Sequence, residues 1–352
     1  MLFFVLYGIT AAIPLIASAY LLLRRANAIA PSVTSPVRLR RWTASFFAVA
    51  TLAHVWWLLF YIFSGDPHSV SCAVLSMVDC VLLFVTFVGM LFAMLQDRRR
   101  PVWPALAAML PFVSLGTAYI VFSNSLLVKM ASIYLLLLGL AFTGYMVYAI
   151  RQYERWLNNN YADLEDKKVW LCLTVSLACM LMFILYVFAD DMTLIWLVHF
   201  VELLLVGLLL WRVETLPLLE QLPVHPQTQQ PTASPVTIDL AIELLLQQNC
   251  IDTQLYLQRD LTINQLAQAL GTNRTYLSQY FSSLDTTYNA YINKLRIDHF
   301  CRLYQEEMAA NHYPTAQQLF SRCGYRSYST FSLAFKQRMG QSVASWMREN
   351  TK

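Results

Sequence analysis

Apolar residues form long, nearly uninterrupted runs in the N-terminal part of the chain. Seven runs occur, at residues 2–23, 43–63, 70–95, 102–122, 127–150, 168–189 and 193–212. Because roughly 20 helical residues cross a hydrocarbon core of about 30 Å, each run is long enough to span a membrane. The pattern therefore predicts seven transmembrane helices. We expect Pro111 to kink the fourth, since proline cannot donate the backbone hydrogen bond of a helix.

The pattern changes in the C-terminal third. From Thr237 onward, apolar residues recur every three or four positions, which is the period of short amphipathic helices. Segment 213–236 carries five prolines among Gln and Thr residues, and such a composition buries too little apolar surface to fold alone. We predict an all-α chain with a seven-helix transmembrane sensor at 1–212, a linker at 213–236 and a soluble helical domain at 237–352.

Composition and charge support this division and give an orientation. The chain is 57% hydrophobic and only 13% charged, which is too apolar for one ordinary soluble domain. Cations gather in every second loop and are sparse in the others, and short cationic loops stay in the cytoplasm. These cations are Arg24, Arg25, Arg38, Arg40 and Arg41, then Arg98, Arg99 and Arg100, then Arg151, Arg155, Lys167 and Lys168. The N-terminus is therefore expected outside and the soluble domain inside the cell.

The segment at 261–281 has the pattern of two short helices joined by a tight turn. Leu266, Ala267 and Leu270 share the inner face of the first helix, Gly271 makes the turn, and Asn273 can cap the second. The buried stripe of the second helix is Tyr276, Leu277, Tyr280 and Phe281. Four polar residues remain outward, as a helix needs in order to read a major groove: Arg274, Thr275, Ser278 and Gln279.

A similar pattern occurs a second time, from Ala316 through Gly324 and Tyr325 to Trp346, and Leu295-Arg296-Ile297 lies in a connecting helix between the two. With these motifs, residues 238–348 resemble the DNA-binding domain of the AraC family of bacterial transcription regulators. The resemblance implies two helix-turn-helix heads on one rigid helix, which enter successive major grooves. It places Arg274, Thr275, Ser278 and Gln279 on the first head. It places Ser327, Tyr328, Ser329 and Ser332 on the second, with Lys336 nearer the phosphates.

Three positions depart from the family pattern. Ala316 stands where a larger aliphatic residue is usual, Phe320 where a small one is usual, and Val343 in place of proline. We expect Phe320 either to be accommodated by a repacked core or to change how the second head docks. Residues 237–352 hold 11 Lys and Arg against 9 Asp and Glu, so phosphate attraction should be moderate, and groove contacts or a homodimer must supply affinity.

Ionisable residues inside the apolar runs are costly and need an explanation. His54, Asp79, His199 and Glu202 fall at similar depth in the second, third and seventh runs. If those helices adjoin, the four residues form a sensor pocket for a proton, a cation or a small ligand. Interhelical hydrogen bonds that stabilise the bundle are the equal alternative. A metal site is less favoured, because no spacing is diagnostic.

No enzyme signature is present. The sequence contains no phosphate-binding loop, nucleophile elbow or kinase motif, and its seven cysteines lack zinc-site spacing. We therefore expect no catalytic residue, metal or cofactor. The prediction is a regulator of the bacterial inner membrane that binds promoter DNA in response to a small-molecule or membrane signal. The alternative is a membrane receptor or scaffold whose C-terminal domain binds a protein partner.

Overall fold

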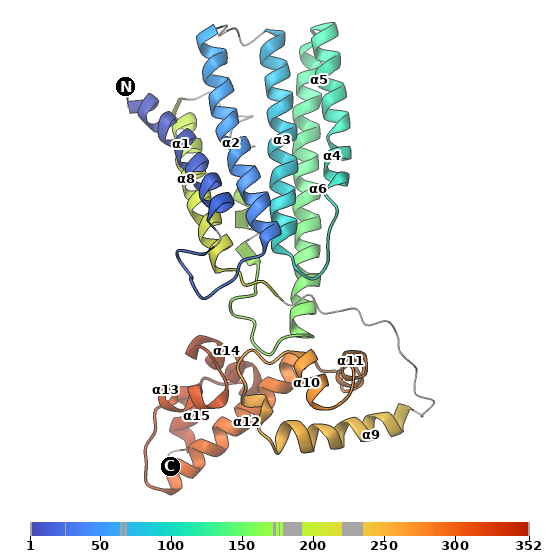
Figure 1. Cartoon of the computed structure of the whole chain (residues 1–352), viewed down its shortest axis with the longest axis vertical. Helices are drawn as coiled ribbons and strands as arrows, with labels where there is room; N and C mark the ends of the chain where they lie inside the picture. The colour runs from blue at the N-terminus through green and yellow to red at the C-terminus, as the bar shows by residue number, and fades with distance from the viewer. Residues whose placement is uncertain are drawn as a thin grey trace. The chain divides into compact units, whose positions relative to one another are not determined.

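The computed structural model describes residues 2–24, 26–63, 66, 69–171, 174–175, 177–178, 192–219 and 235–350. Within these ranges every regular element is a helix, apart from one isolated β-bridge between Tyr161 and Thr262. The predicted all-α fold is confirmed. The chain forms two compact units (Figure 1). Unit 1 comprises Met1–Tyr153 with Val169–Glu220, and unit 2 comprises Glu154–Lys168 with Gln221–Lys352.

Unit 1 is a set of long apolar helices. They are α1 (Leu2–Leu23), α2 (Val37–Phe63), α3 (Val70–Met94), α4 (Trp103–Ala108), α5 (Leu110–Phe122), α6 (Ser125–Asn158) and α8 (Met192–Thr215). Among the described residues they provide six candidate membrane spans, with α4 and α5 together forming one. Each span corresponds to a predicted run. Most of the remaining run, at 168–189, lies outside the described residues.

The fourth run is broken where a proline kink is expected. Helix α4 ends at Ala108 and α5 begins at Leu110, with Pro111 in its first turn. The amide of Met109 bonds to the Leu106 carbonyl at 3.1 Å, and Pro111 has no amide to continue the ladder. The run therefore contains two helices.

Helices α1, α2 and α8 pack together, and α2 also packs on α3. At one end of α8, the Glu214 carboxylate accepts hydrogen bonds from the amides of Ala28 (3.0 Å) and Ile29 (2.7 Å) and from the Tyr20 hydroxyl. Glu214 is almost fully buried, so these donors compensate for its desolvation. The contact fixes the loop between α1 and α2 to the end of α8.

The chain that follows α8 stays within unit 1 for several residues. The Gln96 side chain donates to the Pro217 carbonyl at 2.9 Å and accepts from the Leu219 amide at 3.0 Å. Leu216 and Leu219 are buried. Residues 213–219, the beginning of the predicted linker, are thus packed, while most of the rest lies outside the described residues.

Unit 2 contains two hydrophobic clusters that share one long helix. Its helices are α9 (Pro235–Leu246), α10 (Ile263–Ala269), α11 (Arg274–Ser283), α12 (Tyr288–Ala309), α13 (Ala316–Leu319), α14 (Tyr328–Met339) and α15 (Val343–Asn350). The first half of α12 supplies Tyr288 and Ile292 to the first cluster, and the second half supplies Phe300 and Tyr304 to the second. Helix α12 is therefore the connecting helix that Leu295-Arg296-Ile297 predicted.

The junction of the two clusters depends on Arg296, which is 1% exposed. Its Nε donates to the Tyr256 carbonyl at 2.7 Å, its Nη2 donates to the Gln258 carbonyl at 2.8 Å, and its guanidinium lies over the Tyr325 ring. Burial lowers the pKa of this guanidinium, whereas Tyr325 and Tyr288 raise it. Beside it, Gly324 has a φ of +80°, and a Cβ there would lie 2.6 Å from the Leu257 carbonyl oxygen.

Candidate nucleic-acid interface

The first helix pair of unit 2 is built as its sequence predicts. Thr262 caps α10 in a capping box with Gln265, and Gly271 takes a φ of +66° in the turn. The Asn273 side chain then caps α11 by accepting from the Tyr276 amide at 3.0 Å. Leu277, Tyr280 and Phe281 are buried in the first cluster. This packing fixes which face of α11 remains accessible.

The accessible face carries the four residues predicted for the first head. Thr275 and Gln279 are exposed, and Arg274 and Ser278 are half-buried. Burial lowers the pKa of the Arg274 guanidinium, and Tyr161 raises it, so Arg274 lies close to the segment that follows α6. The face offers one cation, two hydroxyls and one amide, which are the groups that contact base edges and phosphates.

The residues predicted for the second head lie on α14 or cap it. Ser327 caps the helix by accepting from the Thr330 amide at 3.3 Å. Ser329 and Lys336 are exposed, and Ser327 and Ser332 are half-buried. Tyr328 is also half-buried, because its ring meets Phe320 edge-on with centroids 5.7 Å apart.

Phe320 is accommodated by the second cluster. Its ring stacks on Phe331 with centroids 6.3 Å apart, and Ala316 also borders that cluster. Helix α13 ends at Leu319, and Phe320–Cys323 form a 3-10 turn. Phe320 thus packs against the second cluster, and how the second head docks on DNA stays a prediction. Val343, in the position usually held by proline, is buried at the start of α15.

Comparison with known proteins agrees with this geometry. Residues 266–349 match the family model described as a helix-turn-helix domain. That family model is of an AraC-type helix-turn-helix, so the match is a similarity of this domain to that type. No curated protein and no solved structure matches the chain. The match ends one residue short of the end of α15. A helix-turn-helix domain supports a function as a DNA-binding transcription regulator.

The surface of α14 also has an acidic partner that the sequence analysis missed. The Glu165 carboxylate accepts hydrogen bonds from the hydroxyls of Ser327, Ser329 (3.1 Å) and Thr330 (2.6 Å). Burial raises the pKa of Glu165, but these hydrogen bonds and nearby Arg326 outweigh it and hold the pKa below its usual value. The only sign in the sequence is a group of acidic residues in a loop expected to be cationic.

The ionisable residues predicted for a sensor pocket are partly brought together in unit 1. His54 Nε2 lies 3.4 Å from Glu202 Oε2, and the His54 and His199 rings are 5.7 Å apart. Tyr7 of α1 joins them, with its hydroxyl donating to the His54 carbonyl at 2.6 Å. Asp79 instead accepts from Trp57 Nε1 at 2.6 Å. We call Tyr7, His54, His199 and Glu202 the α1–α2–α8 cluster; Tyr7 was missed because a tyrosine in an apolar run gives little signal.

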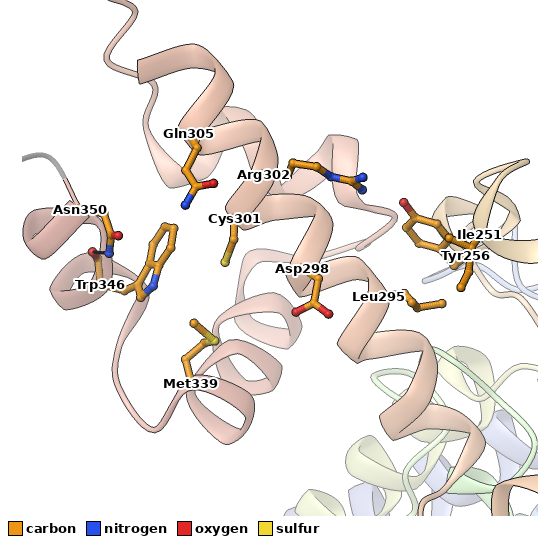
Figure 2. Close-up of a pocket in the computed structure, with 10 residues that line it drawn as sticks. All are labelled: Ile251, Tyr256, Leu295, Asp298, Cys301, Arg302, Gln305, Met339, Trp346 and Asn350. Carbon is orange, nitrogen blue, oxygen red and sulfur yellow. Dashed lines mark hydrogen bonds between the residues drawn. The ribbon is translucent and has the colours of Figure 1, made fainter. Parts of the chain in front are cut away.

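A hollow of about 580 Å³ runs along α12 on unit 2. Figure 2 shows Tyr256 on one side of it and Met339 and Trp346 on the other, with Asp298 and Arg302 of α12 between them. None of the predicted site residues lines it. Among the described residues, no group of three or more His, Cys, Asp or Glu side chains is arranged to hold a metal ion.

Proposed function

We propose that the chain is a membrane-bound one-component transcriptional regulator. The observation that carries this proposal is that a helix-turn-helix match at 266–349 and six apolar helices of membrane-spanning length occur in one polypeptide. The alternation of cationic loops supports an external N-terminus and a cytoplasmic DNA-binding domain. The location we propose is the bacterial inner membrane.

DNA is read by two heads in this proposal. The accessible faces of α11 and α14 enter successive major grooves, and Arg274 and Lys336 contribute the cations that meet bases or phosphates. The weak charge balance of the domain favours a homodimer, since two linked domains gain affinity without new contacts. The partners are thus promoter DNA, the bilayer and a second copy of the chain.

The signal enters through unit 1. The α1–α2–α8 cluster places two imidazoles, a carboxylate and a phenol among apolar helices, where such groups are costly and usually functional. A proton, cation or small polar molecule that binds there would change how α2 and α8 pack. That change in packing, or in dimerisation, would alter how two DNA-binding domains are spaced.

The test uses the full-length protein in cells and in lipid nanodiscs. Genomic fragments crosslinked to the protein in cells are recovered, and their binding is measured over a range of salt concentrations. We expect affinity to fall with salt and Arg274→Ala to weaken binding by roughly 5- to 150-fold, as for a base-contacting arginine. Arg348→Ala, which removes an exposed cation of α15, is the matched control. Absent or salt-insensitive binding would favour the protein scaffold instead.

A further inference from the structure

The segment 159–168, which follows α6, is an integral part of unit 2. It pairs with the chain just before α10. The Ala162 amide donates to the Leu261 carbonyl at 3.1 Å, and the Ile263 amide donates to the Asn160 carbonyl at 3.0 Å. The Asn289 side chain donates to the carbonyls of Tyr161 (3.1 Å) and Ala162 (2.8 Å). These bonds fix the backbone of the segment on the first half of the domain.

The segment also packs into the first hydrophobic cluster. Ala162 is 2% exposed and belongs to the same hydrophobic cluster as Leu266 and Leu277. Tyr161 is 4% exposed and lies near Arg274 of the first head. The segment therefore has a defined binding site on unit 2, formed by backbone hydrogen bonds and by apolar burial.

The far end of the segment reaches the second head with two carboxylates. Glu165 accepts the three hydroxyls at the start of α14, and Asp166 pairs with Arg326 Nη1 at 2.8 Å. Arg326 also meets Asp260 at 2.5 Å, and Lys167 lies 3.3 Å from the same carboxylate. Four polar side chains at this end of α14 thus contact acidic side chains: Arg326, Ser327, Ser329 and Thr330.

These groups are the ones that a DNA phosphate would use. Hydroxyls at the first turn of a helix, the helix dipole and an adjacent guanidinium together make an anion-binding site. A phosphate and the Glu165 carboxylate cannot occupy the same hydroxyls. The two carboxylates would also repel the DNA backbone while they remain in place.

We propose that segment 159–168 is an internal competitor of DNA, which occupies the second head through Glu165 and Asp166 and must leave before both heads can bind. The inference rests on the proposed DNA binding. The segment continues directly from α6. A shift of that helix would therefore place the segment on its binding site or withdraw it, which gives the signal a route to the DNA-binding unit. The DNA-binding unit is then held inactive by the segment that follows α6.

The test compares three full-length proteins in nanodiscs: wild type, Glu165→Ala with Asp166→Ala, and the control Glu154→Ala. Glu154 lies in α6 and is not among the carboxylates that contact α14. The probe is a 40-base-pair duplex that the double variant selects from a random-sequence pool. We expect the double variant to bind it about tenfold more tightly than the wild type, and the control to bind like the wild type.

Hydrogen exchange of the same samples provides an independent readout. Unchanged exchange in α10 to α12 shows that the double variant is folded. When the duplex is added to wild type, amide exchange in 159–168 should rise, because the segment is displaced. Equal affinity of all three proteins, or greater protection of 159–168 on DNA, would overturn the competitor while leaving DNA binding intact. If the double variant enriches no duplex from the pool, the proposed function itself fails.

Discussion

At the scale of single residues, the junction between the two clusters of unit 2 depends on a close backbone contact at Gly324. A Cβ there would lie 2.6 Å from the Leu257 carbonyl oxygen, whereas a Cβ at Gly340 has no atom within 4 Å, although both residues have positive φ. We expect Gly340→Ala to cost roughly 1–2 kcal/mol for the left-handed backbone alone. Gly324→Ala should cost about 1–3 kcal/mol more, because the carbonyl must move.

Native-state hydrogen exchange of α12 and α14 measures this difference in the full-length protein. The Gly340 variant serves as the control, since it shares the backbone strain and lacks the clash. Equal losses in the two variants would show that the Leu257 contact does not hold the junction.

Arg296 supplies the polar half of the same junction. Replacing it with Met removes the donor of the buried Tyr256 carbonyl and also the donor of the carbonyl of exposed Gln258, so we expect a loss of about 1–3 kcal/mol in the stability of α12. Arg296→Lys keeps the charge but not the planar fork, and should recover only part of that loss. Thermal unfolding and hydrogen exchange test the expected order of stability, which is wild type, then Arg296→Lys, then Arg296→Met. Arg302→Lys, at an exposed position of α12, is the control. A lysine variant as stable as wild type would contradict it.

At the scale of elements, α11 and α14 should contribute differently to DNA binding. Lys336 is exposed near the end of α14, where it is placed to meet phosphates. Lys336→Ala is expected to weaken binding to all sequences alike and to lower the salt slope by about 1, as the loss of one phosphate contact does. Gln279→Ala on α11 should instead alter base preference at one position. Titrations against matched and mismatched duplexes distinguish these effects.

The helices of unit 2 were largely predictable, because local signals set them. Asn273 fixes the start of α11, and Leu277, Tyr280 and Phe281 fix its buried face. Arg296 was not recognised as buried, because periodicity assigns an arginine to the solvent face unless its partners are known. Those partners, Tyr256 and Gln258, lie about 40 residues away in sequence.

The binding site of segment 159–168 could not be predicted from the sequence either, because its contacts join residues that are far apart along the chain. Glu165 and Ser327 are separated by 162 positions and meet only in the folded unit. For the loop after α6, the positive-inside rule counts only cations such as Lys167 and Lys168. It gives no role to the neighbouring acids Glu165 and Asp166. Local patterns predict elements, whereas contacts between distant elements need the structure.

At the scale of the whole molecule, α8 carries both the polar cluster and the exit toward the DNA-binding domain. Glu202 lies 3.4 Å from His54 of α2, while the other end of α8 is held by Glu214 and followed by packed Leu216 and Leu219. A change in the α2–α8 contact therefore acts on a helix whose end is fixed by hydrogen bonds. This continuity makes α8 an element through which a change at the cluster would reach the chain that leads to the DNA-binding domain, in addition to the route through α6 and segment 159–168.

Glu202→Gln tests that idea, because it keeps the shape of the side chain while it removes the ionisable carboxyl group that faces His54. We expect it to change output from a reporter driven by a recovered promoter fragment, by roughly 5- to 150-fold if the cluster is coupled to DNA binding with the energy usual for allosteric sites. Membrane insertion should be unchanged. Thr117→Val is the control, since the Thr117 hydroxyl donates within its own helix to the Val113 carbonyl. If the reporter output of the Glu202→Gln variant equals that of the Thr117→Val control, the cluster serves only as interhelical hydrogen bonding. The signal would then have to enter elsewhere in the bundle.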